Sequence, residues 1–279
     1  MVPASRKTVC TRLLWGGLFI LLLPANLRAQ SSAGSNQAGP FEAAPQRPTF
    51  TVNTTTTAPG TLELEFGATG TSSFGGLLAL PSNIKFTPDV SGGVFQCAEF
   101  SLSFDAASSV AVADRRETQF GDSLSFVIRR PVYRGKALSF AVSPRPIFFL
   151  RDNRGLRLGI RAVSEYDHHL DSVVVNFTWT RATSPTPTNT PNEFDIASDY
   201  SHTFGDTGIR NRFSVFAGLL LEKPSKQDAA VSLGQGISYR LRSNRVLDCA
   251  VRELGWTTGA RGYEILAGFT TNFGRLWPE

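Results

Sequence analysis

After residue 60, apolar and polar residues alternate with a period of two, which is the pattern of β-strands that have one apolar and one polar face. The first such stretch places Leu62, Leu64 and Phe66 on one face and Glu63 and Glu65 on the other. Similar stretches recur near residues 78–86, 99–104, 124–129, 138–149, 156–161, 173–179, 193–200, 212–219, 231–240, 247–252 and 263–273. The pattern therefore predicts about twelve strands.

The stretch over residues 138–149 is poorer than the others because it contains Pro144 and Pro146. Proline removes a backbone donor from the ladder of a sheet, so we expect this strand to be kinked, bulged or interrupted. Twelve is an even number, as single-chain bacterial outer-membrane barrels require. The predicted fold class is all-β, with a single antiparallel transmembrane β-barrel of about 12 strands over residues 61–279.

The connections between the predicted strands alternate in length. Every second one is short, and these lie near Asp89–Gly93, Arg134–Lys136, Asp167–Asp171, Gly205–Gly208 and Arg242–Arg245. The others are mostly longer and include Ala106–Gln119, Ala182–Asn192 and Gly255–Arg261. Because outer-membrane barrels have short periplasmic turns and longer outer loops, this order predicts that the first strand begins on the periplasmic side.

Alternation alone does not tell which face points inward. A soluble β-sandwich buries its apolar face and exposes its charges, whereas a membrane barrel turns the apolar face toward lipid. We favour the barrel because strands of about ten residues can cross a bilayer, and because charges of both signs lie in mid-strand, as in a narrow lumen of paired charges. The residues predicted to line the lumen are Glu63, Glu65, Arg129, Arg157, Arg161, Glu193, Asp195, Asp199, Arg212, Arg240, Asp248, Arg252 and Glu264.

Residues 1–29 have the features of a secretory signal peptide. Basic residues open this leader, Leu13–Leu23 forms its apolar stretch, and Leu27-Arg28-Ala29 resembles a cleavage site. An uncleaved anchor helix is the alternative, but the apolar stretch is about half as long as a membrane span. The leader therefore predicts export from the cytoplasm.

Removing the leader changes the charge of the chain. The whole chain has 28 Lys and Arg residues against 23 Asp and Glu residues, and four of the basic residues lie in the leader, so 24 basic residues remain. The resulting net charge of +1 gives no support for nucleic-acid binding. Residues 30–60 are rich in Ser, Gly, Pro, Gln and Thr, which predicts a flexible periplasmic N-terminal segment that is a tether or a lightly docked arm.

Cys97 and Cys249 are the cysteines that follow the leader. Their strand parities place them on opposite faces, so we expect two lone buried thiols and no disulfide.

Two sites near the predicted turns could carry chemistry. His168 and His169 suggest a metal site, but adjacent side chains point to opposite sides, so a solvated turn is the plainer interpretation. Ser201 and His202 suggest a lipid hydrolase, but the same parity separates the nucleophile from its base.

Glu63 and Glu65 share a face and could form an acid–base pair, but lumen charges balanced by arginines are the expected filling of such a barrel. We expect no enzymatic activity, no cofactor and no bound metal.

Several short motifs resemble the outer-membrane family labelled "meta-pathway of phenol degradation", whose members are described as transporter-like. These motifs are Arg47-Pro48-Thr49-Phe50-Thr51 with Pro59-Gly60-Thr61-Leu62-Glu63, Phe120-Gly121-Asp122-Ser123-Leu124, Gly236-Ile237-Ser238-Tyr239-Arg240, and Leu266-Ala267-Gly268-Phe269-Thr270. The resemblance implies an outer-membrane barrel with a transport role, and it assigns no catalytic residue. The chain departs from the family in the Pro144 strand and in the residues that follow Phe273.

These observations predict an outer-membrane protein of a Gram-negative-type cell envelope. The function that we expect is a passive channel or transporter for small molecules, with hydrophobic or aromatic ones among the candidates. The alternatives are a closed structural barrel that acts through its extracellular loops, and a lipid-acting enzyme. The expected partners are outer-membrane lipid, the barrel-assembly machinery and a small-molecule solute.

Overall fold

The structure is a computed structural model. It describes residues 42–46, 49–73, 83–95, 98–112, 115–121, 123–150, 155–185, 190–205, 212–258 and 261–276. The predicted signal peptide, residues 30–41 and Cys97 lie outside the described residues, so those predictions stay untested.

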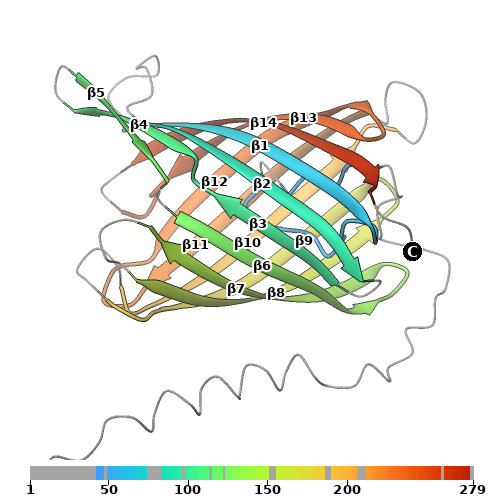
Figure 1. Ribbon diagram of the computed structural model, residues 1–279, viewed down its shortest axis with the longest axis horizontal. Helices are drawn as coiled ribbons and strands as arrows, with labels where there is room; N and C mark the ends of the chain where they lie inside the picture. Colours follow the sequence, from blue (N-terminus) through green and yellow to red (C-terminus); the bar gives the residue numbers. More distant parts are fainter. Residues whose placement is uncertain are drawn as a thin grey trace, which may run out of the picture. The chain divides into compact units, whose positions relative to one another are not determined.

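The described residues form fourteen antiparallel strands in one sheet (Figure 1). The strands are β1 (Thr61–Ser73), β2 (Asn83–Phe95), β3 (Ala98–Phe104), β4 (Ala107–Val112), β5 (Arg115–Phe120), β6 (Ser123–Arg134), β7 (Leu138–Phe149), β8 (Leu156–His168), β9 (Asp171–Ala182), β10 (Asn192–Thr203), β11 (Phe213–Pro224), β12 (Ala230–Arg242), β13 (Arg245–Leu254) and β14 (Gly262–Arg275). Because β1 pairs with both β2 and β14, the sheet closes into a barrel.

The barrel has twelve strand positions although fourteen strands are distinguished. β2 pairs with β3 along one part of its length and with β4 along another, so β3 and β4 follow one another along the same neighbour. On their other side, β3 pairs with β6 and β4 pairs with β5. β3 and β4 therefore share one strand position, and β5 and β6 share the next. The prediction of a barrel of about 12 strands is therefore confirmed, and β4 and β5 form a hairpin that extends beyond it (Figure 1).

The side chains follow the inverted pattern of a membrane barrel. Glu63, Asn176 and Asn272 are among the largest fully buried side chains, whereas Phe66 and Trp179 are exposed on the outside. A soluble sandwich would bury the aromatic residues and expose the carboxylate. The polar face therefore lies inside the barrel, and the apolar face forms its outer wall.

Two predicted connections are wrong in detail. Residues Asp89–Gly93 were expected to form a turn, but β2 continues through them and pairs Asp89 with Ser103. Their Gly and Asp content is typical of turns, yet the cross-strand pairing with β3 outweighs this local preference. The long connection predicted at Ala106–Gln119 instead contains the β4–β5 hairpin.

The proline-containing strand β7 is intact on one side and interrupted on the other. It pairs with β8 without a shift in register. On the β6 side, the pairing stops between Ser125 and Arg130, opposite Pro144 and Pro146. Residues two apart in a strand direct their backbone groups to the same neighbour, so both prolines withhold a donor from β6. The predicted interruption is confirmed for this seam.

The two ends of the barrel differ in the length of their connections. At the end where β1 begins, two residues separate β2 from β3, β8 from β9 and β12 from β13, and three separate β6 from β7. Nine residues separate β10 from β11 at this end. At the other end, five to nine residues separate β1 from β2, β7 from β8, β9 from β10, β11 from β12 and β13 from β14. We call the first end the short-turn end.

Cys249 has a free thiol and is exposed on the outer face of β13, so its predicted burial is wrong. The cause is the inverted barrel, in which an outward residue faces the surroundings and not a core.

Within the described ranges, no helix is long and apolar enough to cross a membrane.

Candidate functional site

A segment of the chain that precedes β1 lies inside the barrel. Its described residues, 42–46 and 49–60, contact inward-facing side chains of β1, β3, β8, β10 and β13, which surround the lumen. We call these residues the lumen segment. Composition predicted a flexible tether or a lightly docked arm here, and the described part is docked, with defined partners on the wall. The composition argument counts only apolar burial, whereas polar hydrogen bonds position this segment.

The first contacts of the lumen segment lie near the short-turn end. The backbone N–H of Ala43 donates to the carbonyl of Ser243 in the β12–β13 turn, at 2.9 Å. The N–H of Ala44 donates to Glu63 Oε2 at 2.8 Å, and the N–H of Gln46 donates to Glu65 Oε1 at 2.6 Å. Glu63 and Glu65 are both buried. The two carboxylates that the sequence places on one face therefore point into the barrel, where each accepts a hydrogen bond from a backbone N–H of the segment.

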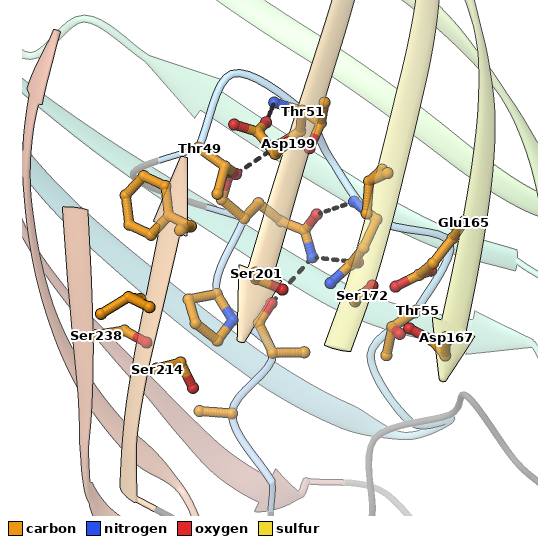
Figure 2. Close-up of a pocket in the computed structure, with 18 of the residues that line it drawn as sticks. Thr49, Thr51, Thr55, Glu165, Asp167, Ser172, Asp199, Ser201, Ser214 and Ser238 are labelled. Atoms are coloured by element: carbon orange, nitrogen blue, oxygen red, sulfur yellow. Dashed lines mark hydrogen bonds between the residues drawn. The ribbon is translucent and has the colours of Figure 1, made fainter. Parts of the chain in front are cut away.

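Three more wall carboxylates accept backbone N–H groups of the same segment. These bonds join Thr51 to Asp199 Oδ2 at 2.6 Å (Figure 2), Thr54 to Glu165 Oε2 at 2.7 Å, and Thr57 to Glu99 Oε2 at 2.6 Å. The hydroxyls of Thr54 and Thr57 donate to the same oxygens as their own amides. Hydrogen bonds to an ionised acceptor are stronger than neutral ones, so each pair ties the segment firmly to the wall.

Two arginines hold the carbonyl oxygens of the segment. Arg129 Nη1 donates to the carbonyl of Thr55 at 2.8 Å and lies 3.4 Å from Glu99 Oε1. Arg252 Nη2 donates to the carbonyl of Thr49 at 2.8 Å. The wall therefore offers both acceptors and donors to the backbone of the segment.

The tip of the lumen segment lies at Phe50. The guanidinium of Arg252 lies over the Phe50 ring, 4.5 Å from its centroid. A Cβ atom at Gly234 would stand 2.8 Å from the same ring, so a glycine is needed on β12 to leave room for it.

Side-chain amides and a small apolar contact complete the attachment. Asn272 Nδ2 donates to the carbonyl of Glu42 at 2.8 Å. Asn176, with its amide nitrogen turned toward Val52, lies 3.0 Å from the Val52 carbonyl and 2.7 Å from its N–H. Val52 packs against the cluster of Ala141, Val163 and Val174. Polar contacts thus predominate between the segment and the wall.

The segment and the wall satisfy each other's polar groups. A buried carboxylate without hydrogen bonds costs several kcal/mol, as does a buried backbone N–H without an acceptor. When a lumen carboxylate accepts a hydrogen bond from a backbone N–H of the segment, the carboxylate gains a donor and the N–H gains an acceptor, so neither group is buried without a partner. Water would have to replace these bonds if the segment left the lumen.

A polar cavity of about 420 Å³ lies between the segment and the wall formed by β8 to β12 (Figure 2). Its wall side chains include Asp167, Ser172, Ser201, Ser214, Ser238 and Arg240. These residues lie at the ends of strands next to the short turns. The cavity therefore forms a hydroxyl-rich vestibule on that side of the segment.

The other half of the lumen has charges of both signs. Arg157 forms an ion pair with Glu193, and Arg252 Nη1 lies 3.5 Å from Glu264 Oε2. Carboxylate oxygens of Glu193, Asp195 and Glu222 all lie within 4.8 Å of one another. We call these three residues the outer carboxylates.

The structure separates the predicted lumen residues into three groups. The buried ones are Glu63, Glu65, Arg129, Asp199 and Asp248. The half-buried ones are Arg157, Arg161, Glu193, Asp195, Arg252 and Glu264. Arg212 and Arg240 are exposed, and only Arg240 of these two lines the cavity. Arg212 comes directly before β11 begins.

Two carboxylates that hold the segment were not among the predicted lumen residues. Glu165 lies on the part of β8 beyond the predicted stretch, although the parity of Arg157 and Arg161 extends to it. Glu99 lies on the polar face of the alternating stretch over residues 99–104. In both cases the signal was the alternation itself, continued to the end of the strand.

The other candidate sites have different geometries. Ser201 lines the lumen cavity whereas His202 bonds to Asp171 outside it, so the predicted separation of this pair is confirmed. The rings of His168 and His169 are in contact, with centroids 4.4 Å apart, so the prediction that they point apart is wrong. The cause is the left-handed backbone of His169, whose φ of 56° breaks the alternation of a strand.

The barrel was compared with known proteins. No family model matches the chain, and none of the curated proteins matches it. Among solved structures it is similar to the KdgM porin, with 8% identity and a TM-score of 0.54 over 75% of this chain and 98% of that chain. The chain has the outer-membrane β-barrel fold.

Two further similarities have lower scores. The CymD monoaromatic hydrocarbon channel has 7% identity and a TM-score of 0.47, over 78% of this barrel chain and 89% of its own. LpxR from Salmonella typhimurium has 11% identity and a TM-score of 0.44, over 75% and 99%. At such identities the likeness concerns the fold alone. The resemblance to the phenol-degradation family has no matching family model and stays a prediction.

Proposed function

We propose that this protein is an outer-membrane channel for small polar solutes, and that its own lumen segment closes it. The observation that carries the proposal is the position of the segment across a lumen lined by charged and hydroxyl side chains. The proposal includes the outer membrane as the location and no catalytic role. The short-turn end is then periplasmic, as the connection lengths favour.

The lining supports polar solutes over the hydrophobic or aromatic molecules considered from the sequence. An apolar solute would have to pass buried Glu, Asp and Arg side chains, which would lose hydration without gaining a partner. A polar solute can replace that water with its own hydrogen bonds. The mixed signs of the charges further favour neutral or zwitterionic solutes over a strong ion preference.

The attachment of the segment supports a removable closure. Most of its described contacts are hydrogen bonds that water can also make, and its larger apolar side chains in contact with the wall are Phe50 and Val52. Leaving the lumen would therefore expose little apolar surface, which keeps the hydrophobic cost of opening small.

Planar-bilayer recording tests the proposal directly. We expect a low conductance for the full chain, and a severalfold rise when residues 42–57 are deleted, because the described lumen segment then no longer crosses the lumen. Deletion of residues 30–41 is the matched control, since it shortens the same N-terminal region and leaves the described contacts in place. A deletion variant that folds but conducts no better than the full chain would contradict the channel.

A closed structural barrel is the second candidate. The observation that favours it is the number of strands that hold the segment, because a closure fixed on β1, β3, β8, β10 and β13 resembles a permanent filling. The same recording separates the two functions: here, removing residues 42–57 would lower the thermal stability of the barrel and leave its conductance unchanged.

A further inference from the structure

A second cavity lies on the outer face of the barrel, away from the lumen. This groove has a volume of about 330 Å³ and is lined by Tyr166, His168, Asp171, Val173 and Tyr200. These residues belong to β8, β9 and β10 and lie next to the short turns. By strand parity all five point outward, so the groove faces the surroundings of the barrel.

The register of the three strands builds the groove in rows. Val173 on β9 lies between Tyr166 on β8 and Tyr200 on β10. In the next row toward the turn, Asp171 lies between His168 and His202. A small residue and a carboxylate therefore form the floor, and aromatic rings form both walls.

Asp171 is the charged group of this groove. Its Oδ1 accepts hydrogen bonds from the Tyr200 hydroxyl at 2.6 Å and from His202 Nδ1 at 2.8 Å. Its side chain is still 42% exposed, and within the described part of the chain nothing bonds to its Oδ2. A carboxylate between two tyrosine rings is a suitable environment for an ammonium group, which it attracts by ion pairing and by cation–π contact.

The rows beyond the tyrosines become progressively apolar toward the middle of the barrel. Val175 lies between Ser164 and Ser198, and the row after it pairs Phe177 with Ala162 and Ile196. The same strip of wall therefore offers a charge at the rim, hydroxyls next to it and apolar side chains farther on. A phospholipid has this order of groups along its length, from headgroup through ester to acyl chain.

We propose that this groove binds a phospholipid with a primary-ammonium headgroup. The ammonium lies against Asp171 between Tyr166 and Tyr200, the phosphate lies near the two histidines, and one acyl chain follows Val175 and Phe177. Tyrosines at this level agree with their enrichment at membrane interfaces. The inference needs the membrane location of the proposed function but not its conductance, so the two can fail separately.

Native mass spectrometry of the folded barrel in detergent tests the inference, with phosphatidylethanolamine and phosphatidylglycerol of equal acyl chains as probes. We expect the wild-type barrel to retain the ethanolamine lipid severalfold better than the glycerol lipid. Asp171→Asn should abolish this preference, because it removes the charge while keeping the shape. Asp228→Asn is the matched control: it makes the same change in the exposed connection at the other end of the barrel and should leave the preference intact.

Two further variants separate the ring walls from the carboxylate. Tyr166→Leu removes one aromatic wall and should weaken the preference in part, whereas Tyr200→Phe keeps the ring and loses only the bond to Asp171, with a smaller effect. Heat-modifiable gel mobility confirms that each variant is folded. Equal retention of both lipids by the wild type, or an unchanged preference in folded Asp171→Asn, would overturn the inference. Release of the lipid by an equal concentration of soluble phosphoethanolamine would overturn the assignment to a lipid.

Discussion

The two halves of the lumen satisfy their carboxylates in different ways. In the half nearer the short turns, Glu63, Glu65, Glu99, Glu165 and Asp199 accept hydrogen bonds from the backbone of the lumen segment. In the other half, the carboxylates face arginines or one another. Inward carboxylates of the same kind therefore have different roles in the two halves. Those nearer the short turns position the lumen segment, and those in the other half remain available to a solute or to water.

The largest expected effect comes from removing two carboxylates that hold the segment. Each charge-assisted hydrogen bond is worth about 1.5–3 kcal/mol, so Glu99→Gln combined with Glu165→Gln should release the segment in a large fraction of molecules. Proteinase K digestion of the folded barrel, read by mass spectrometry of the N-terminus, measures this release. We expect rapid cleavage within residues 42–60 in the variant and slow cleavage in the wild type.

The outer carboxylates supply the matched control for that pair. Asp195→Asn combined with Glu222→Gln also removes two charges from the lumen, but neither side chain is among the carboxylates that accept hydrogen bonds from the described lumen segment. Digestion should remain slow in this control. Equally fast cleavage in both double variants would show that the two halves do not differ in the way described.

An intermediate effect is expected at the tip of the segment. Gly234→Ala places a methyl group against the Phe50 ring, and overpacking of this kind costs about 1–3 kcal/mol. The same digestion should show faster cleavage than in the wild type. Phe50→Ala in the Gly234→Ala background removes the clash, although it also removes the contact with Arg252, so the double variant should differ from Phe50→Ala alone by little. A large additional effect of Gly234→Ala in that background would contradict the contact.

The smallest effect concerns ion preference in the opened barrel. In the variant that lacks residues 42–57, Asp195→Asn with Glu222→Gln leaves the arginines of this half in excess. The reversal potential in a salt gradient should therefore shift toward anion preference. Arg212→Ala should leave the reversal potential unchanged, because Arg212 is exposed ahead of β11 and is not among the residues that line the lumen cavity of about 420 Å³.

Much of the barrel could be predicted from the sequence because its rule is local. A period of two fixes which side chains share a face, and Glu63, Glu65 and Asp199 were assigned correctly to the interior on that basis alone. The rule fails where a strand has weak alternation. β2 passes through Asp89 to Gly93, and its continuation there depends on pairing with β3, which no local pattern of Gly and Asp residues reveals.

The lumen segment could not be predicted in the same way, because its order depends on partners far away in the sequence. Thr54 finds its acceptor at Glu165, 111 residues later, and Thr51 finds its acceptor at Asp199, 148 residues later. The threonine run at residues 54–57 has no apolar periodicity from which such contacts could be predicted. The wall residues gave a sign, since carboxylates buried on the inner face of a strand need hydrogen-bond donors.

The closing seam of the barrel has a consequence for its biogenesis. β1 pairs with β14, so the two edges that join come from opposite ends of the described chain. The lumen segment continues directly into β1 through Gly60, whose φ of 76° turns the chain at the lumen mouth. The sheet cannot close into a barrel before β14 has formed and paired with β1, and until then its interior is accessible through the gap between the two edges. The simplest order of assembly is therefore one in which the curling sheet wraps around its own N-terminal residues.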